Sequence, residues 1–150
     1  MNMVTAQRPH FSVAIDWKQR DIEQWLEQYG SWLLSDYKYE SLGANSVMGK
    51  LLDMAQGVST NYKRRVLPKC RITDNEADAV EDLLKHVMQT ETTKAKRWIR
   101  IVVAYYVEGM SEETVADVFK MSRFGVTRDK MHGIIRIVSK HSCLTSRLID

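Results

Sequence analysis

Residues 111–140 are predicted to form two helices joined by a tight turn. Ser111 can cap the first helix, which puts the carboxylates of Glu112 and Glu113 in its first turn, where the helix dipole favours negative charge. Apolar residues then recur at helical spacing until the pattern stops, and Ser122 can cap a second helix. A short helix, a turn of three or four residues and a longer basic helix are the parts of a helix-turn-helix.

The second of these helices separates apolar from basic positions. We expect the apolar positions to face the core: Val126, Met131, Ile134, Ile135 and Val138. We expect the following side chains to face solvent: Arg123, Thr127, Arg128, Lys130 and Arg136. Two steeply crossing helices need a small residue where they touch, and Ala116 supplies it, with Val126 pointing back into the same junction.

The string VADVFKMSRFGV resembles the helix-turn-helix units of phage repressors. It departs from them at two positions. Lys120 stands where glycine is common, which is costly if that residue needs a positive φ. Asp129 stands where an apolar residue is common. The alternative to a DNA-binding unit is an ordinary helical hairpin with a charged outer face.

Length and composition favour a single cytosolic domain. The chain has 150 residues, of which 44% are hydrophobic, and its two prolines leave long stretches free to be helical. It has no secretory signal and no apolar run of membrane-spanning length, so we expect no membrane contact and a cytoplasmic location. Cys70 and Cys143 lack the spacing of a zinc site, even with His141 nearby, so we expect neither metal nor cofactor.

Basic residues are concentrated in residues 61–71, which hold five of them and no acidic residue. Pro68 and the absence of periodicity predict a loop. We expect this basic loop to contact a polyanion or RNA polymerase through Lys63, Arg64, Arg65, Lys69 and Arg71. The alternative is a solvated linker.

A short helix is predicted with Val47, Met48, Leu51, Leu52 and Ala55 facing inward and Gly57 as its stop. Three longer helices are also predicted. The first has a strongly aromatic stripe, Ile22, Trp25, Leu26, Tyr29, Trp32 and Leu33. Its opposite face is polar, and Gly30 interrupts it, which we interpret as room for a close neighbour. The second helix starts at a capping box of Thr73 and Glu76. The third, residues 94–109, is apolar round most of its circumference, so we place it at the centre of a bundle with Trp98 buried.

The sequence therefore predicts an all-α fold, a helical bundle that contains a helix-turn-helix. We expect five parts: a mobile N-terminal arm (1–15), N-terminal aromatic helices (16–60), the basic loop (61–72), the DNA-binding domain (73–144) and a C-terminal tail (145–150).

Two resemblances to known protein families make this prediction more specific. Residues 71–144 resemble region four of bacterial sigma factors, with supporting helices followed by a helix-turn-helix. Over residues 17–144, the order of WLEQYGSWLL, the basic loop, TDNEADAVEDLL and VVAYYVEGMSEETVADVFKMSR is similar to the lambdoid-phage antitermination protein Q family, in the branch with a sigma-like domain.

The second resemblance implies a phage late-gene antitermination factor in the cytoplasm of a bacterial host, associated with the nucleoid. Such proteins bind double-stranded DNA near a late promoter, load onto RNA polymerase holoenzyme, and stay with the elongation complex, where they occupy the RNA exit channel beside nascent RNA. The resemblance places DNA contacts at Ser122, Arg123, Phe124, Thr127, Arg128 and Lys130.

Other functions compete with this one. An enzyme is disfavoured because the chain has no glycine-rich phosphate loop and no carboxylate cluster beside a nucleophile. An RNA-only binder is disfavoured because the predicted elements include no aromatic-bearing sheet. A plain regulator, either a sigma-like activator or a repressor that dimerises through the aromatic helix, stays open.

Overall fold

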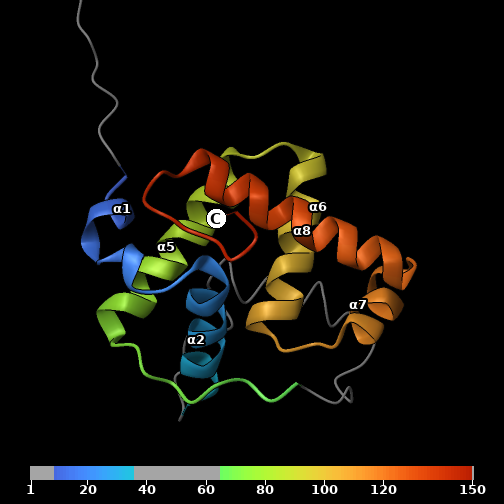
Figure 1. Ribbon diagram of the computed structural model, residues 1–150, viewed down its shortest axis with the longest axis horizontal. Coiled ribbons are helices and arrows are strands. Elements are labelled where there is room, and N and C mark those ends of the chain that lie inside the picture. Colours follow the sequence, from blue (N-terminus) through green and yellow to red (C-terminus); the bar gives the residue numbers. More distant parts are fainter. Residues whose placement is uncertain (1–8, 36–64, 150) are drawn as a thin grey trace, which may run out of the picture.

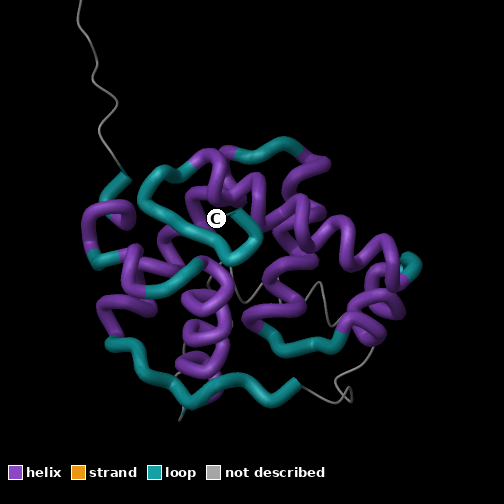
Figure 2. Tube along the Cα trace, in the orientation of Figure 1, coloured by secondary structure: helices purple, strands orange, loops and turns teal. Residues whose placement is uncertain are grey.

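The computed structural model describes residues 9–35 and 65–149, and every regular element in these two ranges is helical (Figures 1 and 2). The all-α prediction is confirmed. In chain order the elements are α1 (Phe11–Ala14), η1 (Trp17–Gln19), α2 (Ile22–Leu34), α5 (Asp74–Thr90), α6 (Thr93–Val102), η2 (Val103–Val107), α7 (Glu112–Phe119) and α8 (Arg123–Lys140). No helix in the described ranges is long and apolar enough to cross a membrane.

Side-chain caps fix where the helices begin. The predicted capping box of α5 is present: Thr73 Oγ1 accepts from the Glu76 backbone N–H at 3.1 Å, and Glu76 Oε1 accepts from the Thr73 N–H at 2.9 Å. Thr92 caps α6 by accepting from the Ala95 N–H at 3.2 Å. The predicted long central helix changes character part-way, because α6 continues into the π-helical segment η2.

The aromatic helix α2 is buried on its apolar side and partly buried on its polar side. All six residues of the predicted stripe are buried. Glu23 and Gln28, which the sequence pattern placed towards solvent, are buried too. The reason is that residues far away in the chain cover this side: Ser146 donates to Glu23 Oε2 at 2.7 Å, and Gln28 bonds the backbone of the loop at Lys69.

Both predicted terminal segments take part in the packing. In the arm predicted for residues 1–15, Phe11 is buried, with its ring 5.4 Å from that of His86 and 5.5 Å from that of His141. In the predicted C-terminal tail, the Thr145 carbonyl accepts from the Ile22 N–H at 2.7 Å. The globular unit therefore includes residues 9–15 and 145–149. Residues 1–8, 36–64 and 150 lie outside the described structure, and so does the short helix predicted around residues 47–55.

Gly30 lies at a close approach of backbones, as the sequence predicted. A Cβ at this position would lie far inside contact distance of the Val107 carbonyl oxygen. Gly133 on α8 likewise allows a close approach to the backbone of α6, since a Cβ there would lie 2.9 Å from the Trp98 carbonyl oxygen. In Figure 1, α8 accordingly lies directly across α6.

Two predictions about burial are wrong. Trp98 is only half-buried, because its ring packs at the edge of α8 against His132, with 5.0 Å between ring centroids. Met131 and Ile135 are exposed, at 42% and 38%. The side of α8 that faces the core instead carries Val126, Asp129, Gly133, Ile134 and Ile137.

Candidate nucleic-acid interface

A three-residue turn, Lys120 to Ser122, joins α7 to α8. Lys120 has φ 54° and ψ 55°, so this lysine does adopt the left-handed conformation that glycine would take without strain. The Met121 N–H donates to the Ala116 carbonyl at 3.0 Å, and Ser122 caps α8 by accepting from the Gly125 N–H at 2.9 Å. The turn is thus held by backbone and capping bonds on both sides.

A small core of its own fixes the angle between α7 and α8. Its buried members are Ile101, Ala104, Met110, Val115 and Val126. Ala116 packs against this cluster, as expected for the small residue at the junction. Asp129 is 5% exposed, and its carboxylate accepts from Arg128 Nε at 3.0 Å, so the polar side chain at a usually apolar position has a charged partner.

The first turns of α8 form an exposed ridge. The side chains of Arg123 and Arg128 are 70% and 54% exposed, and Phe124 is 79% exposed. Ser122 and Thr127 are also exposed. Five of the six residues predicted to contact DNA are therefore exposed, and the sixth, Lys130, is largely covered, with its side chain 15% exposed.

Glu112, at the start of α7, holds three of these predicted residues at once. Its carboxylate accepts from Lys130 Nζ at 2.9 Å and from Thr127 Oγ1 at 3.1 Å, and it lies 3.8 Å from the Arg123 guanidinium. The hydrogen bond from Lys130 is the largest cause that holds the pKa of the Glu112 carboxyl below its ordinary value, against the opposing effect of burial. Sequence analysis predicted only a helix-dipole role for Glu112, because its partners are 11 to 18 positions away.

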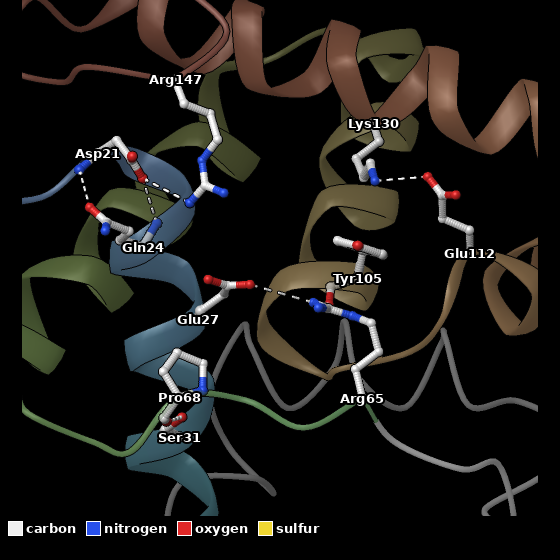
Figure 3. A network of polar contacts seen from close by, with 10 residues as sticks. All are labelled: Asp21, Gln24, Glu27, Ser31, Arg65, Pro68, Tyr105, Glu112, Lys130 and Arg147. Carbon is white, nitrogen blue, oxygen red and sulfur yellow. Dashed lines mark hydrogen bonds and ion pairs between the residues drawn. The ribbon is translucent and has the colours of Figure 1, made fainter.

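Lys130 points into the protein rather than towards solvent. Its ammonium lies 3.6 Å from the centre of the Tyr105 ring, and the Arg65 guanidinium lies 3.8 Å from the same centre. Figure 3 shows Lys130 and Arg65 approaching Tyr105 from above and below, with Glu27 of α2 reaching Arg65 at 3.8 Å. Cation–π contacts to Tyr105 thus join the basic loop and α8 to η2, and the Glu27–Arg65 ion pair adds α2.

The basic side chains of the loop therefore fall into two groups, one bound inside the protein and one exposed. Arg65 is bound internally, since it also donates to the Tyr105 carbonyl at 2.6 Å. Lys69 and Arg71 are exposed, while their backbones bond to Gln28 of α2. Lys63 and Arg64 lie outside the described residues. Within residues 9–35 and 65–149, no three His, Cys, Asp or Glu side chains gather in a way that could hold a metal ion.

Replacing Glu112 with Gln is expected to lower stability near neutral pH, because Lys130 and Arg123 lose their charged partner. A carboxyl with a depressed pKa in the folded state stabilises the fold above its unfolded pKa, and this contribution is lost as the pH falls through the folded value. The difference in unfolding free energy from the wild type should therefore shrink below about pH 4.5. Thermal melts over pH 3–7 would measure it. Glu113→Gln is the matched control, and an equal loss in both variants would contradict the assignment.

Comparison with known proteins identifies the family. A search of curated proteins and a search of solved structures each found no match. The sequence model of the family described as "Phage antitermination protein Q" matches residues 19–138. The match spans α2, the basic loop and most of α8, and it confirms the predicted resemblance to the antitermination protein Q family. The chain belongs to the phage antitermination protein Q family, whose role lies in bacteriophage transcription antitermination.

Proposed function

We propose that this chain is a late-gene antitermination factor that reaches RNA polymerase by way of DNA. It binds a specific double-stranded element near a phage late promoter, loads onto bacterial RNA polymerase paused there, and makes the enzyme read through pauses and terminators. The family match over residues 19–138 carries this proposal. Its action is binding rather than catalysis, in the cytoplasm of the bacterial host.

The exposed ridge of α8 supports the DNA-binding step. An α-helix fits the major groove of B-DNA, where an arginine can bond the O6 and N7 atoms of guanine in a bidentate contact. In this proposal the exposed Arg128 and Arg123 make such contacts, and the exposed Phe124 packs on a thymine methyl group. Lys130 supports the ridge from beneath, through Glu112 and Tyr105.

The remaining surface supplies the polymerase-binding step in this proposal. The exposed Lys69 and Arg71 of the basic loop offer charge to an acidic protein surface or to nascent RNA in the exit channel. The ordered contacts of this loop with α2 hold it at a fixed place relative to α8.

A reconstituted transcription reaction tests the proposal. The template carries the promoter-proximal element bound by the chain and a terminator far downstream. With the protein present, the ratio of terminated to total transcript should fall, because the factor stays with polymerase. The variant R123A/R128A should restore the ratio, because loading through DNA fails.

Two arms make this test specific. The variant K18A/K85A, which loses two charges from η1 and α5, should keep the read-through of the wild type. A plain activator or repressor would change total transcript and leave the ratio untouched. An unchanged ratio with the protein bound at its element would therefore refute antitermination and favour a plain regulator.

A further inference from the structure

A polar groove lies beside the exposed ridge of α8, between the start of α6 and the first half of α8. It encloses about 550 Å³. Its lining residues are Lys94, Arg97, Trp98, Met121, Ser122, Gly125, Arg128, Asp129 and His132. Two of these, Ser122 and Arg128, also belong to the exposed ridge, so the groove and the ridge form one continuous surface.

The cationic side chains that α6 contributes are free to bind an anion. Lys94 and Arg97 are exposed, and within the described residues neither forms an ion pair with a carboxylate. The Lys94 ammonium lies 5.8 Å from the centre of the Trp98 ring. The one carboxylate in the groove, Asp129, is already bonded to Arg128 at 3.0 Å. The groove therefore carries net positive charge together with an aromatic wall.

The groove and the Glu112 contact lie on opposite sides of α8. An α-helix turns by about 100° per residue, so Arg123, Thr127 and Lys130 share one side. Gly125, Asp129 and His132 lie on the opposite side, which borders the groove. Phe124 and Met131 fall between the two sides, where both are exposed. Each flank of the ridge thus faces a different helix.

The two flanks differ in charge. On the α7 flank, Glu112 pairs with Lys130 and lies 3.8 Å from Arg123, and α7 adds the exposed acidic residues Glu113 and Asp117. On the α6 flank, Lys94 and Arg97 are exposed and basic. A helix in the major groove has a phosphate backbone on either side of it. Only the α6 flank suits a close approach of that backbone.

We propose that this α6–α8 groove binds the phosphodiester backbone of one DNA strand bordering the major groove that α8 enters. Lys94 and Arg97 contact its phosphates, and Trp98 packs against a deoxyribose. The inference rests on the proposed DNA binding by α8 and adds to it a second, sequence-independent contact that fixes the orientation of the helix.

The test uses the full chain with a duplex that it enriches from a randomised library, and a scrambled duplex of equal length. K94A/R97A should weaken binding of both duplexes by the same factor. It should also reduce the slope of log affinity against log salt by about 2, because each lost phosphate contact removes about 0.9. K18A/K85A is the matched control with an unchanged slope. K94Q/R97Q repeats the test with side chains of closer size.

Neutral methylphosphonates in the strand that borders the ridge provide an independent arm. They should weaken binding by the wild type and have no further effect on K94A/R97A. R123A/T127A/R128A should instead lose the preference for the enriched duplex, which reports on the proposed function separately.

The outcomes separate the two proposals. If the triple variant loses its preference while K94A/R97A keeps the wild-type slope, the groove assignment is overturned and DNA recognition by α8 stands. If K94A/R97A loses sequence preference without a change of slope, or loses binding to single-stranded RNA alone, the backbone contact is likewise overturned. If the wild type enriches no duplex, both proposals fail.

Discussion

Replacing Trp25 with Ala is expected to lower the free energy of unfolding by roughly 3–5 kcal/mol, the range seen when a large aromatic residue is removed from a core. Trp25 is fully buried, its ring centre lies 5.5 Å from that of Trp17, and its Nε1 donates to the Trp17 carbonyl at 3.1 Å. Truncation would leave a cavity and an unpaired carbonyl together. Denaturant unfolding followed by circular dichroism would measure the loss.

Trp98 provides the matched control. Its ring is half-buried at the edge of α8, so Trp98→Ala should cost less than about 2 kcal/mol. The comparison removes the same side chain in both variants, so the difference reports the deeper burial of Trp25 together with its hydrogen bond to the Trp17 carbonyl. Equal losses at the two positions would show that α2 is not the centre of the core.

Replacing Gly30 with Ala is expected to have the second large effect. The sign of the change in unfolding free energy shows whether helix propensity or steric overlap dominates. Helix propensity alone would make the alanine variant more stable by about 1 kcal/mol. The added Cβ instead meets the Val107 carbonyl oxygen, which belongs to the backbone of η2 and cannot rotate away. We therefore expect a net loss of roughly 1–3 kcal/mol or more, as for overpacked cores.

Gly125 is the control for this substitution. A Cβ there would lie 3.0 Å from Met121 Cε and 3.2 Å from Ser122 Oγ, which are side-chain atoms rather than backbone, so Gly125→Ala should change stability by less than about 1 kcal/mol. Thermal melts of both variants would decide the matter. A higher melting temperature for Gly30→Ala would mean that α2 and η2 do not approach as closely as described.

The sequence predicted those features that depend on local pattern. The stripe of α2 and the capping box at Thr73 follow from spacing within a few residues, and both are present. The turn at Lys120 has the left-handed conformation that the glycine comparison pointed to. The exposed ridge of α8 likewise follows from residues close together in the chain.

The failures involve contacts between distant segments. Glu23 looked solvated because nothing nearby in the chain could cover it, yet Ser146 does so. Trp98 looked central because its helix is apolar all round, but α8 covers only one side of it. Lys130 was expected to face solvent, yet its ammonium lies between Glu112 and Tyr105, which come from distant parts of the chain. Periodicity reports which side of a helix is apolar, whereas burial depends on what packs there.

The contact between Glu23 and Ser146 has a consequence for how the chain folds. The two residues are 123 positions apart, and the Ile22 N–H beside them bonds Thr145. The contacts around α2 are therefore complete only after a very long loop has closed. Closing this loop costs chain entropy, a cost that is much smaller for a helix formed from neighbouring residues. During synthesis, the aromatic side chains of α2 emerge well before the segment that seals their helix. We expect α7 and α8, whose contacts are local, to reach their native arrangement first, and α2 to lock into place as the slow, concluding step.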